Sequence, residues 1–347
     1  MPETERLEHF NYLLILFLLF VFTDKINPQT YPDSTVHQLL LKGIDLIVDE
    51  EYDDAEKVFL TLQQLNKNLP LADIYLAGTE IAKSFDYNLP FNENKISFHL
   101  GRASAVVDKL LIEDNKNIWH IYFEALTEGY RAYYNALRGN WLSAFSDGFS
   151  AVSSSEKCLM IDTSFYDAYI TVGSYKYWRS RKMDFLNWLP FIKDEQEEGI
   201  QLLNRAIKFS PYNSHLGYNS LIWIYIDRKE FGLASELAET VLVQHPKSRL
   251  FKWSYARAIE EFDKERANLV YYDILNSYEK KYDQNRINKI ILKHKIAQNL
   301  MKLGKKKEAS YLLKEILTYK NLTPHESEVL KDRLNRVKSH FNELNKK

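Results

Sequence analysis

The residues that could support catalysis or metal binding are scattered along this chain rather than grouped. None of its nine histidines lies three or four residues from another, so no helix would present a pair of imidazoles to a metal ion. The single cysteine, Cys158, excludes an intramolecular disulfide and every zinc site built from several thiolates. Because Cys158 follows a helical pattern beside Leu159 and Met160, we expect a buried apolar position rather than a nucleophile.

The motifs of common enzyme classes are absent as well. The sequence contains neither the phosphate-binding loops G-x-G-x-x-G and G-x-x-x-x-G-K nor the nucleophile elbow G-x-S-x-G. Its densest carboxylates, in residues 49–54, precede an apolar-striped helix, whose start is favoured by negative charge. We therefore expect no enzyme activity, no cofactor and no metal.

The elements that carry these residues are expected to be helices. A chain of 347 residues that is 45% hydrophobic can bury a sizeable core. Its 11 glycines and 9 prolines are too few for the many turns of a sandwich, a barrel or a doubly wound sheet.

A helix-turn-helix unit recurs along the chain. It is clearest from Asn213 to Pro246, a segment of 34 residues in which two helical patterns flank a short polar turn. Further units share a small residue in the first helix, another twelve positions later and, in most of them, a bulky residue four beyond that. These residues are Gly43, Ala55 and Phe59, then Ala132 and Ala144, then Ala297, Ala309 and Leu313.

This spacing resembles the tetratricopeptide repeat (TPR), in which small residues let two antiparallel helices approach and a proline ends the second. The resemblance covers residues 35–320. It implies an all-α fold, a right-handed superhelical solenoid of TPR-like helix-turn-helix repeats. The amphipathic residues 321–347 are expected to form a C-terminal capping helix, because the end of such an array needs a polar outer face.

Residues 1–34 are expected to form a signal or membrane-anchor segment and a tether. Tyr12 to Phe22 is an unbroken apolar run of 11 residues, which is short for a membrane span but suits the core of a secretory signal. Acidic residues before the run, and the lack of small residues after it, depart from that pattern. The alternative is an apolar helix that packs on the soluble body. With the anchor, the protein would be periplasmic or membrane-anchored in a bacterial envelope, and a cytoplasmic location is the alternative.

One unit departs from the repeat length. Its first helix contains Gly173, but the matching Gly199 comes 26 residues later, which indicates an insert within residues 179–198. Insertions in repeat arrays often carry binding, and the alternative is a plug that hides its own aromatic rings. The aromatic first helix and the Trp-Leu-Pro of the insert resemble a bacterial group of TPR proteins with a secretion signal. The aromatic residues of the insert include Phe185, Trp188 and Phe191.

The first helix of each TPR pair lines the concave surface, so the helical period assigns the lining residues. They form an aromatic and largely uncharged groove, which lacks the Lys/Asn/Arg clamp of co-chaperone members of the family. We expect the groove to bind a protein or peptide partner, and a hydrophobic small molecule or lipid is the alternative ligand. A closed superhelix in which these rings pack together is the interpretation without a ligand. The groove residues are Tyr133, Ile170, Ser174, Tyr177, Trp178, Asn219, Trp223, Trp253 and Arg257.

Charge is distributed unevenly along the chain. Residues 279–347 contain 18 Lys and Arg against 8 Asp and Glu, a net charge of +10, and the preceding residues carry −11. Because the basic residues are scattered rather than clustered, we interpret them as solvated helix faces. Nucleic-acid binding is therefore not expected.

Overall fold

The computed structural model describes residues 29–182, 194–281 and 285–346. In these ranges the regular structure consists of fifteen α-helices, without strands. The helices are α2 (Ser34–Val48), α3 (Tyr52–Leu65), α4 (Leu71–Tyr87), α5 (Glu93–Glu113), α6 (Ile118–Leu137), α7 (Trp141–Ile161), α8 (Ala168–Lys182), α9 (Gln196–Phe209), α10 (Ser214–Asp227), α11 (Phe231–Gln244), α12 (Arg249–Ile259), α13 (Lys264–Lys281), α14 (Arg286–Lys302), α15 (Lys306–Leu317) and α16 (Pro324–Leu344).

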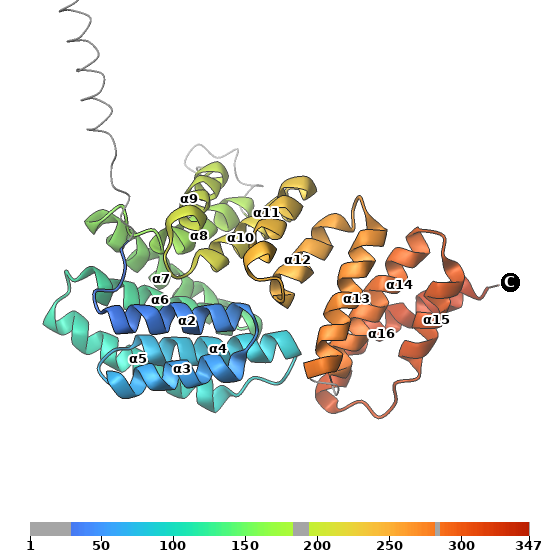
Figure 1. The fold of residues 1–347 in the computed structure, drawn as a ribbon, viewed down its shortest axis with the longest axis horizontal. Helices are drawn as coiled ribbons and strands as arrows, with labels where there is room; N and C mark the ends of the chain where they lie inside the picture. Colours follow the sequence, from blue (N-terminus) through green and yellow to red (C-terminus); the bar gives the residue numbers. More distant parts are fainter. Residues whose placement is uncertain (1–28, 183–193, 282–284, 347) are drawn as a thin grey trace, which may run out of the picture.

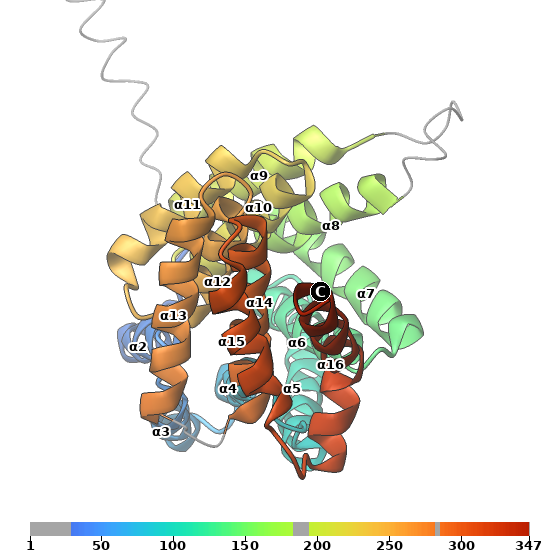
Figure 2. The same ribbon diagram turned by 90° about the vertical axis from the view of Figure 1, so that its right-hand side faces the viewer.

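Each helix packs against the next one along the chain, which gives seven helical pairs followed by α16 (Figure 1). Even-numbered helices also contact one another: α4 with α6, α8 with α10, α10 with α12, and α14 with α16. Odd-numbered helices make no comparable contact in the described part of the chain, so the even-numbered helices form the inner layer of a curved stack (Figure 2). The predicted all-helical solenoid is confirmed.

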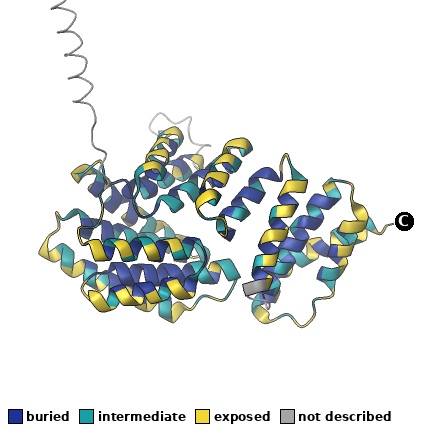
Figure 3. Cartoon of the chain, in the orientation of Figure 1, coloured by how far each residue is buried: buried dark blue, intermediate teal, exposed yellow. Residues whose placement is uncertain are grey.

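Helix α2 illustrates why these segments fold as they do. The Asp33 side chain accepts hydrogen bonds from the backbone N–H groups of Thr35 and Val36, which satisfies the start of the helix. Four apolar residues then recur at four-residue intervals and are all buried, namely Val36, Leu40, Ile44 and Val48. A single hairpin cannot cover such a stripe, so the hairpins stack, with exposed residues along their outer sides (Figure 3).

Small residues set the distance between paired helices, as the repeat pattern predicts. A Cβ atom on Gly43 would lie 2.3 Å from the ring of Phe59, which packs directly on the α2 backbone. A Cβ atom on Gly199 would lie 2.6 Å from the carbonyl oxygen of Gly173 and 2.8 Å from the backbone nitrogen of Tyr177. The expected pairing of Gly173 with Gly199 is therefore confirmed, and α8 and α9 touch through their backbones.

Two further segments are helical, as the repeat pattern predicts. The unit from Asn213 to Pro246 contains α10 and α11, and the capping segment forms α16. The start of α16 has a capping box, in which Thr323 accepts from the N–H of Glu326 and the Glu326 carboxylate accepts from the N–H of Thr323.

The N-terminal run from Tyr12 to Phe22 and the insert residues Phe185, Trp188 and Phe191 lie outside the described residues. Within the described ranges, none of the helices combines the length and the apolar character that crossing a bilayer requires.

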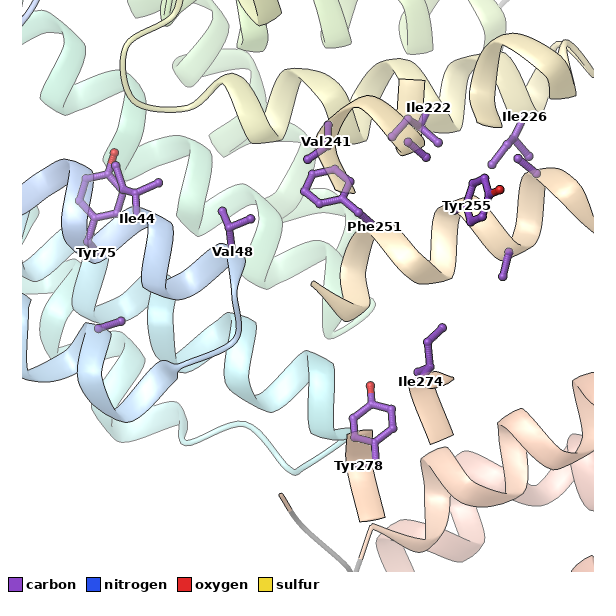
Figure 4. Packing of buried hydrophobic residues seen from close by; sticks show 14 of the residues in the cluster. Ile44, Val48, Tyr75, Ile222, Ile226, Val241, Phe251, Tyr255, Ile274 and Tyr278 are labelled. Atoms are coloured by element: carbon purple, nitrogen blue, oxygen red, sulfur yellow. The ribbon is translucent and has the colours of Figure 1, made fainter. Parts of the chain in front are cut away.

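The array closes on itself, because its first hairpins contact helices about 200 residues later in the chain. The Asp49 carboxylate lies 3.0 Å from Nδ1 of His245, and the backbone N–H of Leu250 donates to the Glu50 carboxylate over 3.0 Å. The amide of Asn88 donates to Asn288 over 2.7 Å. One continuous core accompanies these bonds, with residues from α2, α11, α12 and α13 in a single cluster (Figure 4).

The glycine contact between α8 and α9 can be tested by adding one methyl group. Gly199→Ala is expected to lower the free energy of unfolding by about 1 to 3 kcal/mol, because the new methyl group would force two backbones apart. Gly101→Ala is the matched control, since a Cβ atom on this residue of α5 would meet nothing within 4 Å. The control should stabilise by about 0.5 to 1 kcal/mol through helix propensity. Chemical denaturation measures both, and equal effects of the two substitutions would contradict the contact.

Candidate functional site

The expected groove residues fall into two groups in the structure. Ile170 and Tyr177 are buried in the core, and the Tyr177 hydroxyl donates to the Asp227 carboxylate over 2.9 Å. These two side chains pack between helices and do not line an open surface, which corrects the assignment made from helical period. The other seven keep some exposure: Tyr133, Ser174, Trp178, Asn219, Trp223, Trp253 and Arg257.

Two aromatic residues of the second group are the most accessible. Tyr133 is 46% exposed and Trp223 is 41% exposed. Burial nevertheless raises the pKa of Tyr133 to about 12.

Three of the remaining members have partners within the protein, whereas the side-chain oxygen of Asn219 is buried and accepts no hydrogen bond from the described residues. The Ser174 hydroxyl donates to Ser220 over 3.0 Å, and Trp253 packs edge-on against Tyr271 with ring centres 5.5 Å apart. Arg257 pairs with Glu260 and Glu261, at 3.1 and 2.6 Å.

A buried polar network fills the inner layer near the start of α10. The Asp167 carboxylate accepts from the backbone N–H of Asn213 over 2.8 Å and from the Ser210 hydroxyl over 2.6 Å. The Asn213 amide donates to the Tyr122 hydroxyl over 2.9 Å and accepts from Tyr75 over 3.3 Å. Burial raises the pKa of Asp167 to about 6, although the hydrogen bonds from Ser210 and Asn213 act to lower it. The network joins α4, α6 and the start of α10.

A second buried cluster joins the ends of α4, α12 and α13. Arg249 is 2% exposed and binds Asp86 through two N–H groups, one of them Nε–H over 3.0 Å. The Tyr278 hydroxyl donates to the same carboxylate over 2.7 Å, and its ring centre lies 4.7 Å from the guanidinium carbon of Arg249. Several donors bind the Asp86 carboxylate, the Arg249 guanidinium lies over the Tyr278 ring, and Arg249 is shielded from water. Each of these features strengthens the ion pair.

The buried carboxylate of Glu50 lies beside this cluster. It is 5% exposed, and it accepts from the backbone N–H of Leu250 and from the Ser248 hydroxyl, at 3.0 and 3.3 Å. Arg249 is 3.9 Å away, but Asp86 already engages its charge. Burial therefore dominates and raises the pKa of Glu50 to about 7.

Sequence reasoning missed the most exposed apolar surface, which lies on the first half of α7. Four large side chains there are exposed: Trp141 at 66%, Leu142 at 89%, Phe145 at 70% and Phe149 at 59%. We call these four residues the α7 face. On its other side α7 packs closely on α6, where Gly148 faces Ala132 and Ala151 faces Gly129.

Among the described residues, the α7 face is exposed beside a neighbouring helix that is shorter than α7. Helix α7 has 21 residues, or about 31 Å, and α8 has 15, or about 22 Å. The ammonium of Lys182, at the end of α8, lies 6.0 Å from the ring centre of Trp141. The available sequence signal was an apolar stripe at four-residue spacing, Trp141, Phe145 and Phe149, in a helix whose small residues already supply the packing face.

Cys158 is fully buried, as expected. Burial raises the pKa of its thiol to about 12, so almost no thiolate forms near neutral pH.

The titration of Glu50 predicts a pH-dependent stability. Between about pH 4.5 and pH 7 the folded protein holds a proton on Glu50 that the unfolded chain has released, so rising pH opposes folding. Glu50→Gln keeps the shape and removes the titration. It should flatten the decline in the free energy of unfolding across this window by about 1 to 3 kcal/mol. Urea denaturation at closely spaced pH values measures the slope, and equal slopes for the two proteins would refute the assignment.

Comparison with known proteins gives no relative from which a role could be transferred: no family model matches this chain, and no curated protein matches it.

Proposed function

We propose that this protein is an interaction scaffold of the tetratricopeptide type that binds a helix of a protein partner on the α7 face. The observation that carries the proposal is the exposure of Trp141, Leu142, Phe145 and Phe149 on consecutive turns of one helix. Contiguous apolar surface of this kind is unfavourable in water, and it characterises interaction sites.

The stacking of the array supports a helix as the ligand. Elsewhere in the solenoid the apolar stripe of each helix is covered by the next helix along the chain. Within the described residues α8 is about 9 Å shorter than α7, which is the rise of about six residues. A partner helix in this place would continue the layer that α8 begins.

The spacing of the face defines the partner's chemistry. Trp141, Phe145 and Phe149 recur every four residues and form one stripe along α7. An amphipathic helix with apolar residues at the same spacing would place its ridges between them. Large aromatic side chains at the centre of an interface contribute most of its binding energy. The partially exposed residues of the inner layer, of which Tyr133 and Trp223 are the most accessible, are the second surface that we propose for partner binding.

The proposal includes a location in a bacterial envelope, either periplasmic or held at the membrane. Its support is the apolar run from Tyr12 to Phe22 and the resemblance to bacterial TPR proteins with a secretion signal.

A carrier of a hydrophobic small molecule is the second candidate. A surface pocket of about 390 Å³ supports it, because this volume suits a small ligand. Its apolar lining is Tyr31, Leu69, Leu110, Trp119 and Phe123. Asn66, Asn117 and His120 also line it, so its polarity suits an amphipathic ligand better than a purely apolar one. Lipid extraction of the purified protein should yield a stoichiometric compound if this function holds.

Affinity capture from envelope extracts tests the scaffold. The double variant Trp141→Ser, Phe145→Ser should lose a partner that the unaltered chain retains, with affinity reduced about 100-fold, because two buried aromatic anchors are removed. Circular dichroism checks that each variant is folded.

The matched control is Leu269→Ser, which removes one exposed apolar side chain from α13, far along the array. It should leave capture unchanged. Loss of the partner only on replacing Trp178 and Trp223 by Ala would move the binding surface to the inner layer. Retention of every partner by all these variants would refute the scaffold.

Cell fractionation tests the location. The full chain is expected in the membrane or periplasmic fraction, and a chain that begins at Gln29 should shift to the cytoplasm. The same distribution for both chains would contradict a targeting role for the N-terminal residues.

A further inference from the structure

The strongest unexplained feature of the molecule is a group of basic side chains between α14 and α16. His294 of α14 is fully buried, and its Nε2 lies 3.1 Å from Nδ1 of His340 on α16. An N–H group of Arg333 points at Nδ1 of His294 over 3.5 Å. Arg336 completes the group. We call these four residues the basic cluster.

No carboxylate in the described ranges forms an ion pair with Arg333 or Arg336. Four other basic side chains of α14 have acidic partners, and one of them, Lys289, lies 4.0 Å from Glu279. Arg286 pairs with Glu326, Lys293 with Glu315 and Lys295 with Glu260. The basic cluster therefore stands out from the paired charges around it.

The N–H groups of Arg333 determine which ring nitrogens of His294 and His340 carry protons. A guanidinium has only N–H donors, so Nδ1 of His294 must accept from Arg333 and its Nε2 carries the proton. That proton is donated to Nδ1 of His340, which leaves the Nε2–H of His340 as a donor without an acceptor among the described residues. The series of hydrogen bonds from Arg333 through His294 to His340 thus ends in the Nε2–H group of His340.

Within the described ranges, no ion pair compensates the charge of the two arginines. Burial lowers the pKa of His294 to about 3, and the charges of Arg333, His340 and Arg336 act in the same direction. Burial also lowers the pKa of Arg333, and the neighbouring Arg336 adds to this effect. The charged groups that act most strongly on these two side chains are basic, so the cluster has a positive potential inside a partly dehydrated site.

The site is open to a ligand on one side. Arg333, Arg336 and His340 occupy positions i, i+3 and i+7 of α16, which lie on one face of a helix. Arg336 is exposed, and Arg333 and His340 are half-buried. A ligand can therefore approach along this face while His294 closes the floor.

We propose that Arg333, Arg336 and His340, supported by His294, form a binding site for an oxyanion, a carboxylate or phosphate group of the ligand. Arginine presents paired N–H groups that match two oxygens of either group, and the remaining imidazole N–H supplies a further donor. The ligand would neutralise the charge that the protein leaves unpaired. Arg333 and Arg336 contribute two of the 18 basic residues in 279–347.

The experiment uses the purified full chain with two probes, inorganic phosphate and a blocked oligoglutamate peptide, at constant ionic strength set with sodium chloride. Calorimetric titration should show saturable binding of one or both, and Tm should rise with the bound probe because the ligand stabilises the folded state. Arg333→Gln should weaken binding about tenfold or more. Arg336→Gln, at an exposed position that does not disturb folding, should do the same. Lys331→Gln removes one charge from another face of α16 and should leave binding unchanged.

The two probes separate the sources of the anion. Tighter binding of the peptide identifies an acidic protein segment, and tighter binding of phosphate identifies a phosphorylated or free phosphate ligand. Absence of saturable binding for both would overturn the proposal. Equal loss of affinity in Lys331→Gln and Arg336→Gln would also overturn it, because it would show general attraction by net charge.

Discussion

The ion pair between Arg249 and Asp86 is the point at which this helical array closes. Because Arg249 is buried, removal of either partner would leave a charge without compensation in a dry site. Tyr278 and the amide of Asn288 donate to Asp86 as well, so one aspartate holds α12, α13 and α14 against the end of α4. The curvature of the whole stack therefore depends on contacts between hairpins far apart in sequence, and not only on the packing of neighbours.

Closure changes which surfaces are available for binding. In an open solenoid the inner layer would be the natural groove, but here Asn213 and Asp167 tie the first hairpins to α10, and Tyr75 and Tyr122 fill the space between them. The exposed apolar surface is found instead on α7, where the layer is incomplete. The uncompensated charge is found on α16, where the array ends. Both features occur where the regular succession of helices is interrupted.

Much of the fold could be predicted because it is determined locally. Gly43 beside Phe59, and Gly173 beside Gly199, are recognisable from spacing alone, since close approach of two helices requires a small residue at the crossing. Tyr177 was misassigned for the opposite reason. Its position on α8 is compatible with either side of the helix, and only the contact with Asp227 of α10 shows that it is buried.

The helices, their pairing and the end of the array follow from local sequence, because helical period, small residues and capping signals act over a few turns of chain. The closure of the array, the exposure of the α7 face and the gathering of two arginines and two histidines from α14 and α16 became visible only in three dimensions, among the residues that the structure describes. The physical reason is that burial and charge compensation depend on every neighbour in space. Neighbours contributed by distant hairpins leave no periodic trace in the sequence.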